Sequence, residues 1–118
     1  MAEIEPWPAN EPLPGQLVVD ARIEGDTTVL TLSGELDLAS TSVLERELDA
    51  VESAGATKIL IDLAGVGFMD STGLQALLRA RERALTEHKV DLSLKRGPHQ
   101  VQRVFELTKT IDAFTFVD

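Results

Sequence analysis

The sequence contains no cysteine, which excludes disulfide bonds and thiolate chemistry. It also lacks any run near the roughly 18 apolar residues that cross a bilayer, and no charged-then-apolar signal opens it. We therefore expect a cytoplasmic protein without membrane insertion. Aromatic residues make up only 4% of the chain, whereas hydrophobic residues make up 43%. The core should accordingly consist mainly of Leu, Val, Ile and Ala.

Positive charge is scarce. The chain has 11 basic and 20 acidic residues, a formal net charge of -9. An acidic surface repels nucleic acid phosphates and anionic lipid, so we expect no nucleic acid partner. The same surface can attract a protein with a basic face, but charge alone favours the simpler interpretation that acidity only maintains solubility.

Proline is almost confined to the start of the chain, with four of the five prolines in residues 1–16. Such a segment favours extended backbone and predicts a flexible Pro-rich leader. Trp7 is either a docking anchor within it or part of a poorly ordered tail. The remainder, residues 17–118, has the length of one domain.

This domain alternates strand and helix signals. Residues 17–23 and 28–34 are rich in β-forming residues around Glu24-Gly25-Asp26, a turn signal, and predict a hairpin. The later elements, in chain order, are a helix over 40–54, a buried strand over 58–63, a helix over 71–86, a strand over 90–95, a helix opening at Gly97-Pro98 and a short strand over 114–117.

Local signals predict the helix ends and faces. Ser42 and Glu45 have capping-box spacing, which puts the first helix start near 40–42, and Gly55 ends it. Pro98 suits the first position of the third helix. The expected apolar faces are Leu44, Leu48 and Val51 in the first helix, Leu74, Leu77, Leu78 and Leu85 in the second, and Val101, Val104, Phe105 and Thr108 in the third.

The resulting order, ββαβαβαβ, predicts an α/β fold. Strands that alternate with helices of this length favour parallel pairs with helical cover. The N-terminal hairpin adds one antiparallel pair. We therefore expect a mixed, mostly parallel sheet with helices covering it.

The segment Gly65–Leu74 (GVGFMDSTGL) connects a buried strand to a helix, where open α/β sheets usually present their sites. A helix start exposes unpaired N–H groups that Asp70, Ser71 or Thr72 could cap, and a plain N-cap is one interpretation. Gly73 lowers helix propensity by about 1 kcal/mol and lets another backbone come close. That feature suits a contact surface.

Two motifs in this order resemble a known family. Gly34-Glu35-Leu36-Asp37 after a strand and Phe68–Leu74 (FMDSTGL) before a helix are similar to the paired signature of STAS-domain anti-sigma factor antagonists. Val101–Leu107 (VQRVFEL) also resembles the third helix of the family. The resemblance covers roughly residues 17–117 and implies a single STAS domain.

The resemblance implies a binding switch without a cofactor, not an enzyme. It implies that an anti-sigma factor with serine kinase activity phosphorylates Ser71, and that a PP2C-type phosphatase reverses this. The unphosphorylated form would bind the anti-sigma factor and release a sigma factor, and Asp37 would support recognition by the kinase. The implied partner-binding residues are Asp37, Asp70, Ser71, Thr72, Gly73 and Leu74.

The chain departs from the family pattern at three points. Thr72 stands where many members have a second Ser, so modification of Thr72 is open. Lys109 follows the third helix where a Gly is common. The sequence ends at Asp118, without the final helix of longer members.

Other functions remain open. The two histidines, His88 and His99, lie near helix ends without a nucleophile beside them in sequence, which is typical of surface histidines. Asp37, Asp62 and Asp70 could gather around Mg²⁺, although Asp62 is expected to brace the turn after its strand. The resemblance also allows a non-enzymatic accessory or scaffold subunit, in a lipid-transport ABC system or a stressosome-like complex.

Overall fold

The computed structural model describes residues 15–117, apart from the side chain of His88. Most of the predicted leader, including Trp7, lies outside the described residues. The elements are β1 (Leu17–Glu24), β2 (Thr27–Leu36), α1 (Thr41–Ser53), β3 (Lys58–Met69), α2 (Ser71–Arg83), a π-helical turn (Ala84–His88), β4 (Asp91–Lys95), α3 (His99–Leu107), a 3-10 turn (Ile111–Ala113) and β5 (Phe116–Val117).

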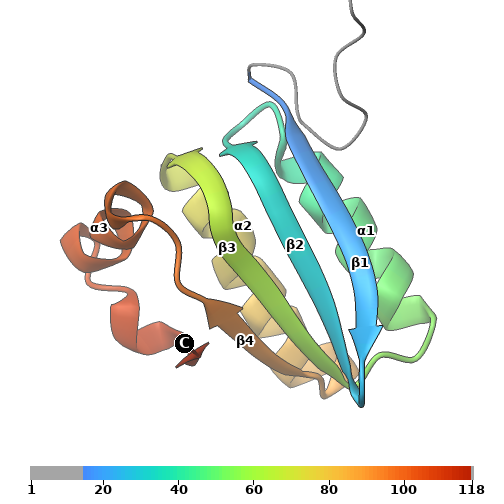
Figure 1. The fold of residues 1–118 in the computed structure, drawn as a ribbon. Helices are drawn as coiled ribbons and strands as arrows, with labels where there is room; N and C mark the ends of the chain where they lie inside the picture. Colours follow the sequence, from blue (N-terminus) through green and yellow to red (C-terminus); the bar gives the residue numbers. More distant parts are fainter. Residues whose placement is uncertain (1–14, 118) are drawn as a thin grey trace, which may run out of the picture.

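The five strands form one sheet in the order β1-β2-β3-β4-β5. β1 and β2 are antiparallel, and every later neighbour is parallel, which confirms the predicted mixed α/β fold. Each parallel step moves in the same direction across the sheet, so right-handed crossovers bring the helices to one face. Figure 1 shows α1 and α2 on that face, behind the sheet, and α3 beside the end of β3 that β4 does not reach.

The core lies between the sheet and the helices. Among its larger fully buried side chains, Phe105 is the one aromatic ring. Phe114 and Phe116 meet this ring edge-on at centroid distances of 5.4 and 5.2 Å. The other large members confirm the expected aliphatic core: Leu30, Leu32, Leu36, Leu44, Leu48, Ile59, Ile61, Leu63, Leu77, Leu94 and Val66.

β3 continues six residues beyond the predicted end at Leu63. The added segment pairs with the end of β2 with two irregularities in register, one before Ser33 and one after Gly34. Gly65 lies at the first of them, where a Cβ atom would be 2.8 Å from the carbonyl oxygen of Leu32. The close approach of the two backbones there requires glycine.

The predicted capping box of α1 is wrong. Ser40, not Ser42, is the N-cap residue, and its buried hydroxyl donates to the carbonyl oxygen of Glu35 at 2.6 Å. The predicted stop at Gly55 is confirmed. Gly55 has a φ of 97°, and the following amide, that of Ala56, bonds back to Val51 in a Schellman motif.

The apolar face of α2 does not extend to Leu85 as predicted. Regular helix ends at Arg83, and a π-helical turn follows. The wider turn brings Ala84 into the core and leaves Leu85 56% exposed.

α3 begins one residue later than predicted, with Pro98 as its N-cap residue. The predicted face is only partly right, since Val101 and Phe105 are buried, Val104 is half-buried and Thr108 is exposed. Lys109 takes the left-handed position of a Schellman motif, with a φ of 59°. The last predicted strand shortens to the two residues of β5.

Candidate functional site

The candidate site lies where β2 and β3 end side by side. Leu36 pairs with Met69 at the last step of the parallel ladder. The chain then leaves β2 through Asp37 toward α1, and leaves β3 through Asp70 into α2. Both family-like motifs therefore meet at one edge of the sheet (Figure 1).

Asp70 caps α2 and leaves Ser71 free. The backbone of Asp70 is extended, and its carboxylate accepts a hydrogen bond from the amide of Gly73 at 2.9 Å. Ser71 is the exposed first residue of the helix, and within residues 15–117 its hydroxyl makes no hydrogen bond. The N-cap interpretation therefore applies to Asp70. A capping role does not account for the serine.

Asp37 holds the loop between β2 and α1. Its Oδ1 accepts from the amides of Ala39 and Ser40 at 3.0 and 3.2 Å. The hydroxyl of Ser40 in turn accepts from the amide of Asp37 at 3.0 Å. This network fixes Asp37 in the loop that follows the end of β2, and that strand end pairs with the end of β3, from which the chain enters α2.

Gly73 brings α2 directly against the end of β2. A Cβ atom at this position would lie 2.2 Å from the carbonyl oxygen of Leu36. Gly73 is buried, and Leu74 is only 4% exposed. Of the six residues predicted to bind a partner, these two therefore support the loop from beneath and offer almost no contact area.

Two exposed apolar side chains lie in the segments where β2 and β3 end, and the sequence analysis missed both. Leu38 is 75% exposed in the β2–α1 loop, and Phe68 is 47% exposed at the end of β3. The only sequence signal was their place inside or beside the two motifs. We define the Ser71 surface as Asp37, Leu38, Phe68, Asp70, Ser71 and Thr72.

The residues suggested for metal binding or acid–base chemistry do not assemble. Within residues 15–117 no group of three or more His, Asp or Glu side chains is arranged to hold a metal ion, so Asp37, Asp62 and Asp70 form no such cluster. Asp62 was expected to brace a turn after its strand, but β3 continues to Met69 and no turn follows; its carboxylate accepts from the amide of Ala64 within the strand at 2.9 Å. His99 is an exposed residue at the start of α3.

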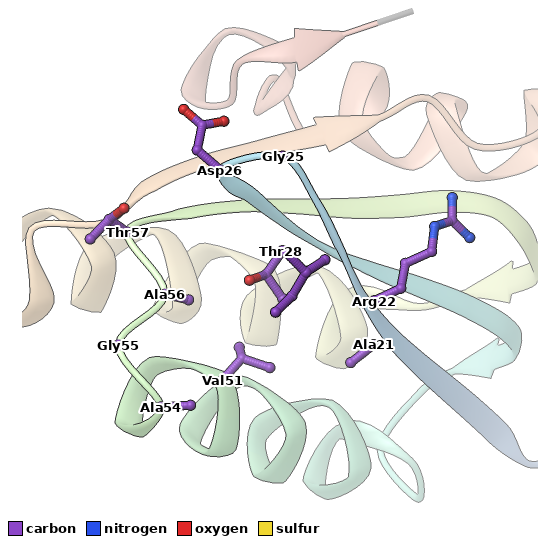
Figure 2. A pocket seen from close by; sticks show the side chains of 11 residues that line it. Ala21, Arg22, Gly25, Asp26, Thr28, Val51, Ala54, Gly55, Ala56 and Thr57 are labelled. Carbon is purple, nitrogen blue, oxygen red and sulfur yellow. The ribbon is translucent and has the colours of Figure 1, made fainter.

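A separate hollow of about 400 Å³ lies at the other end of the sheet, between β1 and the end of α1 (Figure 2). Asp26, which lines this hollow, is the one carboxyl group among the described residues whose pKa departs clearly from its ordinary value. The ammonium of Lys58, 3.0 Å from Asp26, lowers the pKa of that carboxyl below its ordinary value of 3.8. Both side chains are exposed and lie at the opposite end of the sheet from Ser71, so this pair has no bearing on chemistry at the Ser71 surface.

Comparison with known proteins identifies relatives over most of the chain. A family model described as "Mlab, STAS domain" matches residues 19–111. The anti-sigma-F factor antagonist RsfB of Mycobacterium tuberculosis is 32% identical over 84 residues, which cover 71% of this chain and 64% of RsfB. The match thus spans less than two thirds of that relative. Its name is that of a regulatory protein rather than of an enzyme.

Solved structures share the fold. The anti-sigma factor antagonist from Mycobacterium paratuberculosis superposes with a TM-score of 0.74 at 27% identity, covering 85% of this chain and 84% of the other. The Bacillus cell fate determinant SpoIIAA in its phosphorylated form gives a TM-score of 0.62 at 21% identity, covering 86% and 92%. The second likeness shows the fold alone. Among residues 15–117, no helix has the length and apolarity to cross a membrane.

Proposed function

This chain belongs to the STAS domain family, and from that membership and its Ser71 surface we propose that it is an anti-sigma factor antagonist. In its unphosphorylated form it binds an anti-sigma factor that is also a serine kinase, and a sigma factor is released. Phosphorylation of Ser71 ends this binding, and a PP2C-type phosphatase restores it. The switch operates in the cytoplasm.

The observation that carries the proposal is the free hydroxyl of Ser71. A kinase needs a hydroxyl that projects into solvent and is not held by the fold. Ser71 is exposed, and Asp70 already performs the capping that would otherwise occupy it. Thr72 is half-buried, which favours Ser71 as the acceptor.

The Ser71 surface also has the composition of a docking site. Leu38 and Phe68 are exposed apolar side chains that can enter pockets of a partner, since binding energy usually comes from a few such anchors. Asp37 and Asp70 add negative charge at the rim of the same surface. We infer a partner surface with an apolar centre and basic groups around it.

A phosphate on Ser71 would weaken partner binding without unfolding the domain. It adds about 1.5 to 2 negative charges beside Asp70. The N-terminus of α2 favours an anion by roughly 0.3–1 kcal/mol, so the isolated domain should tolerate the group. Burial of the same anion against a partner without new cations costs several kcal/mol. A penalty of about 3–4 kcal/mol weakens binding by roughly 100- to 1,000-fold.

Incubation with anti-sigma kinases of the same genome and ATP, followed by peptide mass mapping, tests the proposal. We expect phosphate on Ser71 in the wild type and in Thr72→Ala, and none in Ser71→Ala. Thr72→Ala is the matched control because it removes the neighbouring hydroxyl. If every kinase leaves the chain unmodified, the switch is wrong, and a non-phosphorylated accessory or scaffold subunit is favoured.

A further inference from the structure

β1 forms one border of the sheet. It pairs with β2 along its whole length of eight residues, and within the described part of the chain no strand pairs with its outer side. The outer N–H and C=O groups of such a strand are a template for another chain. An edge of this length is long compared with the short edge strands that proteins use to avoid pairing.

The two faces of β1 differ in character. Ala21 lies opposite the fully buried Leu30, so Val19, Ala21 and Ile23 point to the face that the helices cover. Asp20 and Arg22 point to the opposite face. Ile23 is 79% exposed although it lies on the covered face.

The exposed Ile23 borders the hollow between β1 and α1. The hollow of about 400 Å³ is lined mainly by small apolar residues, among them Ala21, Val51 and Ala54. Figure 2 shows Ala21 of β1 on one side of this hollow, with Val51 of α1 and the C-cap residue Ala54 on another. The covered face of the sheet is therefore incomplete at its β1 border, and apolar surface there remains in contact with water.

We propose that a second copy of this chain completes this border by antiparallel pairing of β1 with β1, around a two-fold axis at Ala21. Such an axis stands perpendicular to the sheet and keeps the helix-covered faces of both copies on the same side. Val19 of each copy then lies opposite Ile23 of the other. The two five-stranded sheets become one continuous sheet of ten strands.

Charge complementarity selects this register. With Ala21 opposite itself, Asp20 of each copy faces Arg22 of the other, and the symmetry produces this pair twice. If the two-fold axis moved by one residue along β1, it would lie at Asp20 or at Arg22. Asp20 would then face Asp20 of the other copy, or Arg22 would face Arg22. Like charges directly opposite each other destabilise a strand pair, whereas opposite charges stabilise it. Both side chains are exposed. Among residues 15–117, Arg22 pairs with the exposed carboxylate of Glu24 at 3.4 Å.

This interface is independent of the Ser71 surface. The Ser71 surface lies where β2 and β3 end, whereas the hollow lies at the β1–β2 turn, at the opposite end of the sheet. Two copies paired through β1 would therefore present their serines at opposite ends of the joined sheet. Ser71→Asp should not change the pairing, so a failure of the phosphorylation switch and a failure of the dimer are distinguishable.

Charge reversal tests the register. Sedimentation of the full chain over about three decades of concentration gives the dimer dissociation constant. We expect Asp20→Arg alone and Arg22→Asp alone each to raise this constant by about tenfold or more, because each creates two like-charge pairs. The double variant should restore wild-type pairing. An equal mixture of the two single variants should form a heterodimer, since every opposed pair is then complementary.

Two outcomes would overturn the proposal. One is a wild-type chain that stays monomeric at the highest concentration, in which case the charges on β1 protect the edge from pairing or the edge accepts a different protein. The other is a dimer that the single charge reversals leave unchanged. Ile23→Ser provides a second, uncharged variant, and it should also weaken the dimer. Asp20, Arg22 and Ile23 are all exposed, so circular dichroism should show native folding in each variant.

Discussion

Gly73→Ala is the substitution whose effect on stability follows most directly from the packing of the Ser71 surface. The added Cβ would lie 2.2 Å from the carbonyl oxygen of Leu36, and 2.9 Å from its carbonyl carbon and Cγ. Ordinary carbon–oxygen contacts are about 3.3–3.6 Å. The start of α2 would therefore have to move about 1 Å away from the end of β2.

Two effects of opposite sign decide how much Gly73→Ala changes the free energy of unfolding. Overpacking a close contact costs about 1–3 kcal/mol, and a backbone oxygen cannot rotate away, so we expect the upper part of that range. Alanine gains up to about 1 kcal/mol over glycine in a helix interior, and less in the first turn. The net loss in free energy of unfolding is about 1–2 kcal/mol. In urea this lowers the unfolding midpoint by about 0.5–1 M.

Gly67→Ala is the matched control, four residues before the start of α2. No atom lies within 4 Å of a Cβ at Gly67, and the position is in β3, where alanine is no worse than glycine. Its unfolding midpoint should equal or slightly exceed that of the wild type. If Gly73→Ala unfolds at the same urea concentration as Gly67→Ala, the close packing of α2 on β2 does not limit stability, and our reasoning is refuted.

Three further predictions concern capping, backbone strain and charge. Asp70→Ala should lower the free energy of unfolding by about 0.5–2 kcal/mol and Asp70→Asn by much less, since Asn retains the cap; equal urea midpoints would contradict this. Lys109→Gly should raise stability by about 0.5–1 kcal/mol in the same assay, because Lys109 occupies a left-handed conformation; a loss would show that no strain is relieved. Lys58 lowers the pKa of Asp26, so their ion pair stabilises the fold at pH values above 3.8, the ordinary pKa of the carboxyl group. This stabilisation is lost as the pH falls through the lowered pKa of Asp26 in the folded protein. NMR titration should find that Lys58→Gln raises this pKa, and an unchanged value would exclude the pair as its cause.

The order of strands and helices could be predicted because each element carries its own local signal. The β-rich runs around Gly25 form the hairpin, and Gly55 ends α1 by a motif that depends on a single left-handed residue. The strand-to-helix connection at Ser71 was also predicted. Its meaning as a site came from the order of the two motifs, not from composition.

Features that depend on contacts between distant segments could not be predicted. The second half of β3 contains Gly65 and Gly67, which favour a loop, and it is a strand only because β2 lies beside it. The N-cap residue of α1 is Ser40 and not the predicted Ser42. The hydroxyl of Ser40 donates to the carbonyl oxygen of Glu35 near the end of β2, a contact that local spacing does not indicate. The exposure of Leu38 likewise depends on the conformation of the loop between β2 and α1.

The affinity of the cognate anti-sigma factor for this chain before and after stoichiometric phosphorylation of Ser71 is the most direct measurement of the proposed switch. Calorimetric titration of both forms, with circular dichroism to confirm that both are folded, would give the two dissociation constants. We expect the phosphorylated form to bind roughly 100- to 1,000-fold more weakly while its fold is unchanged. Equal affinity of the two folded forms would contradict the electrostatic switch.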